Sequence, residues 1–209
     1  MAGDDRALIV IDVQNDFCPG GALAVAEGDL VVAAINRVAG GFPVRVLTQD
    51  WHPPHHRSFA ANHPDGEAFS SVEMEYGPQV LWPVHCVQGS VGAEFHPELE
   101  TEAADLILRK GFRAGIDSYS AFFENDRKTP TGLAGYLRER EVRRLWLAGL
   151  ATDFCVAYSA IDAAGAGFEV TVLEDATRAI DLDGSLEAAM REMAGRGVSF
   201  AQAAGLPSG

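Results

Sequence analysis

The chain has 209 residues, of which 47% are hydrophobic and 22% are charged, and its formal net charge is −14. This composition is typical of a globular protein that can bury one substantial core. The acidic balance argues against a nucleic-acid-binding surface and against binding to anionic membranes.

Six short apolar runs are predicted strands. Their hydrophobic residues are continuous rather than alternating, which is typical of parallel strands buried on both faces. In chain order they cover 7–11, 44–48, 106–108, 145–147, 170–173 and 198–200. Helical patterns lie between several of them, at 30–38, 133–137, 156–166 and 186–194. The alternation predicts one α/β domain over 1–209, with three α/β/α layers around a six-stranded parallel sheet.

Two long connections interrupt this alternation. The first covers about 50–99 and carries all six histidines, and the second covers 111–128 and is rich in glycine, serine and aromatic residues. Long ordered loops in a compact α/β domain are usually functional. Both follow the carboxyl ends of predicted strands, where such sheets bind ligands.

Three chemically distinct side chains follow predicted strands. Asp12 follows the first strand and Lys110 the third, while Cys155 lies past the fourth, in the first turn of a predicted helix. A helix N-terminus and a nearby ammonium group both favour a thiolate, so we expect a lowered pKa for Cys155, with Asp12 taking its proton. Each residue also has an ordinary interpretation, as a capping Asp, a solvated Lys and a buried Cys. Only two of the sixteen basic residues are lysines, which makes Lys110 notable.

The first long connection contains a candidate metal site. Asp50 and His52 fall on one side of an extended chain, and His56 follows four residues later. His85 could complete a set of one carboxylate and three imidazoles, which suits zinc, iron or manganese rather than calcium. The alternative is a surface loop that is merely rich in histidine.

Cofactor and localisation patterns are otherwise absent from the sequence. It contains no nucleotide-binding glycine motif and no apolar run of the roughly 20 residues that a membrane span needs. The three cysteines are far apart and the first apolar run is only five residues long. We therefore expect neither a disulfide framework nor a signal peptide, and we expect a cytoplasmic location.

Six segments together resemble the nicotinamidase (pyrazinamidase) group of the isochorismatase-like cysteine hydrolases. They occur in the family's order and span nearly the whole chain. The segments are 10–18 (VIDVQNDFC), 48–59 (TQDWHPPHHRSF), 82–87 (WPVHCV), 110–111 (KG), 117–122 (DSYSAF) and 149–156 (GLATDFCV). Phe154 departs from relatives that carry His or Tyr there, and 63–80 aligns with no known pattern.

The resemblance implies a site and a reaction. Nicotinamide, and pyrazinamide with it, would be hydrolysed to the acid and ammonia through a thioester, as a step of NAD salvage. The ring nitrogen would bind one divalent metal ion, zinc first and iron or manganese as alternatives. The resemblance implies a catalytic triad of Asp12, Lys110 and Cys155, and metal ligands Asp50, His52, His56 and His85, supported by Ser58. It implies an oxyanion hole of the Ala151 and Cys155 N–H groups, beside a cis peptide between Leu150 and Ala151. The implied ring pocket consists of Phe17, Leu23, Trp82 and Tyr119. The implied strand order is 3-2-1-4-5-6.

Two other functions are open at this stage. One is hydrolysis of a different small amide, such as an N-carbamoyl or ureido compound, by the same fold; relatives of that kind lack the Asp-x-His-x-x-x-His pattern. The other is a non-catalytic metal-binding domain, because fold alone does not establish activity. Base rates favour a homodimer.

Overall fold

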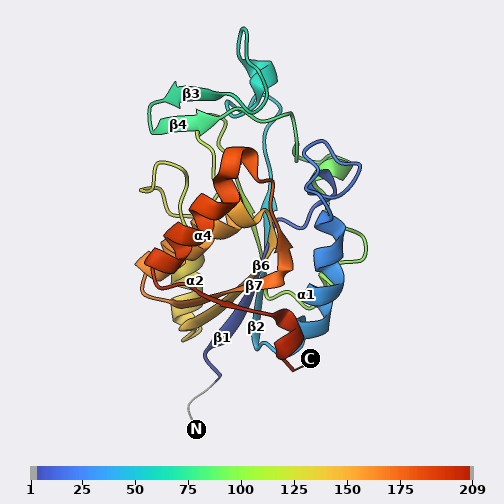
Figure 1. Cartoon of the computed structure of the whole chain (residues 1–209), viewed down its shortest axis with the longest axis vertical. Coiled ribbons are helices and arrows are strands. Elements are labelled where there is room, and N and C mark those ends of the chain that lie inside the picture. The colour runs from blue at the N-terminus through green and yellow to red at the C-terminus, as the bar shows by residue number, and fades with distance from the viewer. Residues whose placement is uncertain (1–3, 208–209) are drawn as a thin grey trace.

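A computed structural model describes residues 4–207, and its centre is one parallel sheet (Figure 1). The six strands pair in the order β5-β2-β1-β6-β7-β8, and every pair is parallel. Counted along the chain, this is the predicted order 3-2-1-4-5-6, which is therefore confirmed. The strands are β1 (Arg6–Ile11), β2 (Val44–Asp50), β5 (Leu106–Lys110), β6 (Arg144–Leu150), β7 (Glu169–Arg178) and β8 (Ser199–Ala201).

The helices cover the two faces of the sheet unequally. They are α1 (Val31–Ala39), α2 (Leu133–Glu139), α3 (Ala157–Gly165) and α4 (Ser185–Gly195). In Figure 1, α1 lies on one side of the sheet and the other three lie on the opposite side. The connection from β2 to β5 contains no α-helix, which leaves α1 as the only one on its side among residues 4–207. This long connection carries the histidines instead.

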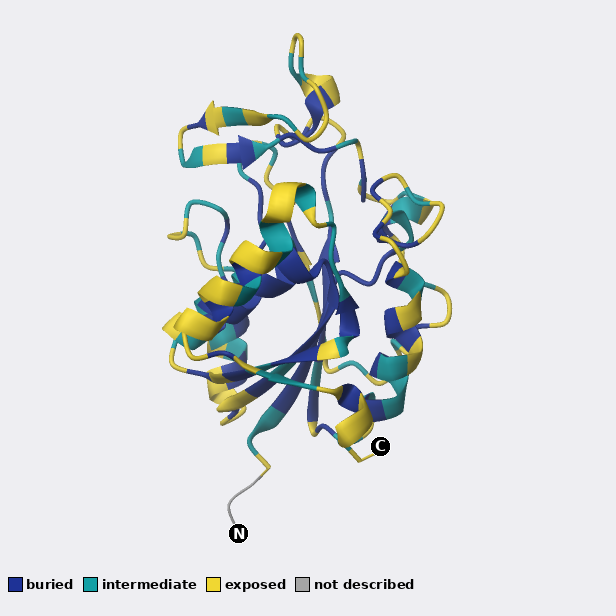
Figure 2. Ribbon diagram, in the orientation of Figure 1, coloured by how far each residue is buried: buried dark blue, intermediate teal, exposed yellow. Residues whose placement is uncertain are grey.

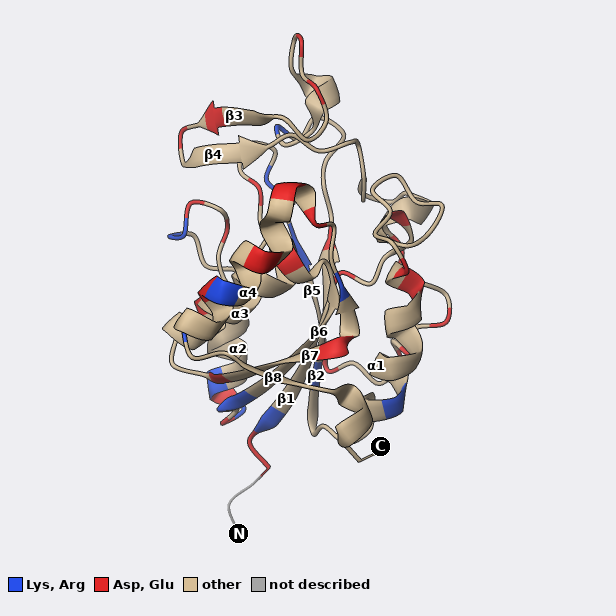
Figure 3. Cartoon of the chain, in the orientation of Figure 1, with Lys and Arg blue, Asp and Glu red and all other residues tan. Residues whose placement is uncertain are grey.

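Burial follows the sequence pattern closely. The central strands are dark in Figure 2, and the outer helix faces are exposed. In α1 the four buried residues are Val31, Val32, Ile35 and Val38, which repeat at helical spacing. Figure 3 shows acidic residues on both sides of the molecule, with basic residues scattered among them.

The strands β2 and β5 are longer than their apolar runs, and this changes what they position. The predicted strands ended at 48 and 108, but the observed strands continue to Asp50 and Lys110. These two residues are the last of neighbouring strands, and they pair directly in the register. Paired residues of adjacent strands point to the same face of a sheet. The carboxylate of Asp50 and the ammonium of Lys110 therefore meet by strand pairing alone.

Beyond the carboxyl edge of the sheet lies a feature that the sequence did not predict. Within the poorly aligned segment 63–80, β3 (Ser71–Met74) and β4 (Gly77–Val80) form an antiparallel hairpin. Figure 1 shows this hairpin above the ends of the parallel strands, far from both termini. Over residues 4–207, no helix is both long enough and apolar enough to cross a membrane.

Candidate active site and metal centre

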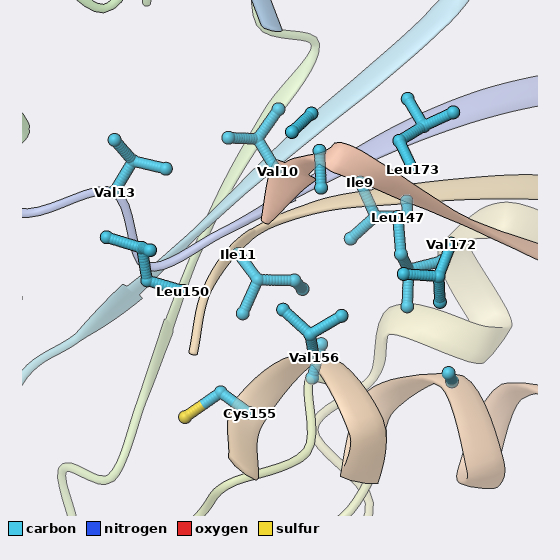
Figure 4. Close-up of a cluster of buried hydrophobic side chains, with 14 of the residues drawn as sticks. Ile9, Val10, Ile11, Val13, Leu147, Leu150, Cys155, Val156, Val172 and Leu173 are labelled. Carbon is cyan, nitrogen blue, oxygen red and sulfur yellow. The ribbon is translucent and has the colours of Figure 1, made fainter. Parts of the chain in front are cut away.

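The predicted site residues converge at the carboxyl edge of the sheet. A pocket that combines apolar walls with a few convergent polar groups lies there, as is typical of small-ligand sites. Twelve residues line it: Phe17, Leu23, Asp50, His52, Trp82, His85, Asp117, Tyr119, Ala151, Phe154, Cys155 and Ile180. In Figure 4, Val156 points toward Ile11 in the core, while the sulfur of Cys155 points away from both residues.

Lys110 is the centre of the polar cluster. Its Nζ lies 2.7 Å from Asp12 Oδ2 and 2.6 Å from Asp50 Oδ1. It also donates to the Ser118 carbonyl at 2.8 Å and lies 3.5 Å from Cys155 Sγ. Lys110 is only 1% exposed, so its charge is balanced by protein groups rather than by water. A single ammonium thus links the candidate nucleophile to a candidate metal ligand.

Asp12 is held in place by a residue that the sequence did not single out. Thr48 Oγ1 donates to Asp12 Oδ1 at 2.6 Å and accepts from the Asp12 backbone N–H at 3.2 Å. Gln14 likewise fixes the backbone of Asp50 with two hydrogen bonds: its Nε2 donates to the Asp50 carbonyl, and its Oε1 accepts from the Asp50 N–H. Both side chains are fully buried. The available sequence signal was position: Thr48 is the last residue of its apolar run, and Gln14 lies two residues after Asp12.

The expected lowering of the thiol pKa is wrong for this structure. Burial raises the pKa of Cys155 well above its ordinary value; Lys110 opposes that rise, and Asp12 and Asp50 add to it. Burial also raises the pKa of Asp12 to about 6, against the opposing charge of Lys110. Burial alone would lower the pKa of Lys110, but Asp12 and Asp50 outweigh it and hold that pKa well above its usual range. The resting pair is therefore a thiol and an ammonium, and a base must remove the thiol proton.

The backbone around Cys155 also differs from a simple helix start. The residue lies in a π-helical turn, Thr152–Val156, which precedes α3. Turns of this kind occur frequently at functional sites. The peptide bond between Leu150 and Ala151 is cis, as the resemblance implied. Ala151 and Cys155, the two candidate oxyanion-hole residues, both line the pocket.

Three of the four predicted metal ligands form a compact group. One donor atom from each of Asp50, His52 and His85 lies within 4.8 Å of the others, and all three residues are buried. His52 Nδ1 is 2.8 Å from the Gly111 carbonyl, and His85 Nδ1 is 2.7 Å from the Pro83 carbonyl. A carbonyl oxygen only accepts, so both rings carry hydrogen on Nδ1 and direct Nε2 to the metal site, where His52 Nε2 lies 3.6 Å from Asp50 Oδ2. This donor chemistry fits a divalent cation.

His56 is placed differently from the other two histidines. Its Nδ1 accepts from the Ser58 backbone N–H at 3.2 Å, and its Nε2 lies 3.3 Å from the Ile116 carbonyl. Both ring nitrogens are thus paired with protein atoms. His56 groups with His52 and with Asp117, which was not among the predicted site residues. Ser58 Oγ lies 2.7 Å from His56 Nδ1, so Ser58 contacts this ring.

Aromatic rings form one wall of the pocket. Trp82 packs edge-on against Phe154 with ring centroids 4.9 Å apart, and Tyr119 meets the same Phe154 ring at 5.8 Å. Phe17 and Leu23 are buried and line the pocket with them. Phe154 and Ile180 were not among the predicted pocket residues, because Phe154 was noted only as a departure from its relatives and Ile180 lies outside the matched segments. Ile180 is fixed by its N–H, which donates to Asp153 Oδ1 at 3.0 Å.

Comparison with known proteins places this site in a family context. A sequence model of the isochorismatase domain family matches residues 6–204. A curated nicotinamidase from Acinetobacter baylyi is 56% identical over 192 residues, covering 92% of this chain and 90% of the relative. A solved nicotinamidase/pyrazinamidase from Acinetobacter baumanii has a TM-score of 0.95 at 54% identity, covering 98% of this chain and 99% of that one. The pyrazinamidase of Pyrococcus horikoshii, solved in complex with zinc, has a TM-score of 0.78 at 35% identity, covering 95% and 99%.

Proposed function

The chain belongs to the isochorismatase domain family, and from that premise and the geometry of its pocket we infer that it is a nicotinamidase, which hydrolyses nicotinamide to nicotinate and ammonia in NAD salvage. The observation that carries this inference is the position of Lys110 Nζ. It lies 3.5 Å from the thiol of Cys155 and 2.6 Å from Asp50, so nucleophile and metal group share one aromatic-lined pocket. Pyrazinamide, a flat ring amide of similar size, should also be hydrolysed.

We propose Asp12, Lys110 and Cys155 as the catalytic residues. Because the thiol is protonated at rest, Asp12 takes its proton as the sulfur attacks the amide carbon. An Asp12 carboxylate oxygen and Cys155 Sγ lie within 4.8 Å of each other. Asp12 then donates that proton to the leaving ammonia, and a thioester to Cys155 remains. Asp12 next removes a proton from water, which attacks the thioester, and returns that proton to the leaving Cys155 sulfur; the acid is released and ionises to nicotinate. Lys110 stays cationic throughout and stabilises the developing thiolate.

The remaining residues bind and orient the substrate. We propose that the backbone N–H groups of Ala151 and Cys155 hold the oxyanion; losing one such donor costs about 3–4 kcal/mol in other enzymes. Phe17, Leu23, Trp82 and Tyr119 would enclose the pyridine ring. A divalent ion bound by Asp50, His52 and His85 would supply a Lewis-acidic position for the ring nitrogen. His56 would be a fourth ligand only after giving up the Ile116 carbonyl.

Ammonia release tests the function directly. Zinc-loaded protein should release ammonia from nicotinamide and from pyrazinamide, and should release much less after chelation, with recovery on adding zinc back. N-carbamoyl and ureido compounds at equal concentration serve as competing substrates. Faster turnover of one of these would assign another small amide, and no turnover of any amide would indicate a non-catalytic metal-binding domain.

The metal ligands can be ranked by matched substitutions. We propose zinc as the ion, with iron and manganese as alternatives, because imidazole and carboxylate donors suit all three. His85→Ala removes a bare Nε2 and should weaken zinc affinity by more than about 100-fold, whereas His56→Ala should weaken it by less than about 10-fold. Calorimetric titration of the metal-free protein gives both values. Equal losses in the two variants would make His56 a full ligand.

Three broader features complete the proposal. The chain forms one isochorismatase-like domain over 1–209, with its metal-binding loop at about 50–99. A cytoplasmic location is supported by three free cysteines, Cys18, Cys86 and Cys155. We also propose a homodimer, which is the commonest oligomer of soluble proteins, and sedimentation analysis checks it.

A further inference from the structure

The β3–β4 hairpin, which was not predicted from the sequence, places one polar side chain behind the wall of the pocket. Gln79 lies on β4 and is only 1% exposed. Its Nε2 lies 3.0 Å from Asp117 Oδ2 and 2.8 Å from the Tyr119 hydroxyl. Asp117 and Tyr119 both line the pocket. Gln79 itself does not, so it can act on the site only through them.

The orientation of the Gln79 amide is fixed by its other contacts. Its Oε1 accepts from Asn125 Nδ2 at 3.0 Å and from the Tyr76 hydroxyl at 3.1 Å. A flipped amide would set oxygen against the Asp117 carboxylate and nitrogen against a donor from Asn125. The amide nitrogen therefore faces Asp117 and Tyr119, and its two hydrogens are shared between these residues and the Val80 carbonyl, which lies 2.7 Å from Nε2. Such a buried and fully paired amide is costly to replace with a group that cannot hydrogen-bond.

The two partners of Gln79 lead to different parts of the site. A carboxylate oxygen of Asp117 lies within 4.8 Å of donor nitrogens on both His52 and His56. Tyr119 also accepts from Trp82 Nε1 at 3.0 Å, and its ring packs on Phe154. The hydrogen bond to Asp117 thus leads toward His52, a proposed metal ligand. The hydrogen bond to Tyr119 leads to the aromatic wall of the pocket.

We propose that Gln79 is a positioning residue, which holds the Asp117 carboxylate beside the metal group and the Tyr119 hydroxyl in the ring pocket. This assigns a role to the β3–β4 hairpin: it supports both halves of the substrate site from outside. The inference rests on the proposed function of that site. Partners of this kind, one layer outside a metal centre, typically change metal affinity or activity by about 10- to 100-fold.

Zinc binding gives a test that does not need turnover. Gln79→Met keeps the length of the side chain and removes its hydrogen bonds. We expect it to weaken zinc affinity by about 10-fold or more and to raise KM for nicotinamide more than it lowers kcat. Glu73→Gln is the matched control, because Glu73 is exposed on the same hairpin. That variant should match wild type in zinc affinity, KM and melting temperature.

A double-mutant cycle separates positioning from general damage. If Gln79 acts on the metal group through Asp117, Gln79→Met should have no further effect on zinc affinity in an Asp117→Asn background and its full effect in a Tyr119→Phe background. Additive losses with Asp117→Asn, or zinc affinity within twofold of wild type, would overturn the proposal.

A second variant covers the case in which Gln79→Met fails to fold. Gln79→Glu keeps the shape and sets a carboxylate against Asp117, so it should lower zinc affinity and melting temperature together. Adding Asp117→Asn restores one donor opposite one acceptor and should recover the melting temperature; no recovery would contradict the contact. Wild-type protein that binds zinc but leaves nicotinamide intact would refute the proposed function, while the zinc measurements would still test Gln79.

Discussion

Replacing Cys155 by alanine should lower ammonia release from nicotinamide by a factor on the order of 10⁴ or more, because the nucleophile itself is lost. Binding should survive the change. The pocket retains its metal group and its aromatic wall, and the smaller side chain opens space beside the ring rather than filling it. Calorimetry with nicotinamide should therefore give a Kd close to the wild-type value, together with turnover at the detection limit.

The matched control uses another buried cysteine. Cys18 is 4% exposed and lies outside the pocket, so Cys18→Ala should keep turnover within about twofold of wild type, because it removes one buried sulfur without touching the site. Mass spectrometry of rapidly quenched wild-type reactions should also reveal a nicotinoyl adduct on Cys155. A Cys155→Ala variant that retains more than a tenth of its turnover would exclude the thioester mechanism.

The parallel sheet could be predicted because its strands are buried on both faces. That burial requires continuous apolar runs, and such runs are visible in a single sequence. Asp12 and Lys110 were predicted for the same reason, because Asp12 directly follows its apolar run and Lys110 follows its run after one residue, Arg109. The register that pairs Asp50 with Lys110 was not predictable from the runs, since both strands continue into polar residues.

The supports of the site were less predictable than its reactive groups. Gln79 and Asp117 are 38 positions apart, and nothing in the sequence between them indicates that their side chains hydrogen-bond. The predicted direction of the Cys155 pKa shift was wrong for a related physical reason. A helix start and a nearby lysine favour the thiolate, but burial beside two carboxylates outweighs them, and burial depends on the packed structure.

Lys110→Met should remove activity and destabilise the fold at the same time. The change leaves Asp12 and Asp50 buried without their shared counterion, which typically costs about 3–5 kcal/mol in the free energy of unfolding. Turnover should fall by at least about 10³-fold, since the developing thiolate also loses its cation. Urea unfolding of chelator-treated protein measures the first effect, and ammonia release measures the second.

A double variant can separate these two roles of Lys110. Lys110→Met with Asp12→Asn removes one of the stranded carboxylates, so part of the lost stability should return while activity stays absent. Lys110→Arg keeps the charge, but a planar guanidinium cannot take the place of an ammonium that contacts Asp12, Asp50 and Cys155 at once, and turnover should again be lost. Near-normal turnover by Lys110→Arg would show that charge alone suffices. In that case the compact geometry around Nζ would serve the fold rather than the reaction.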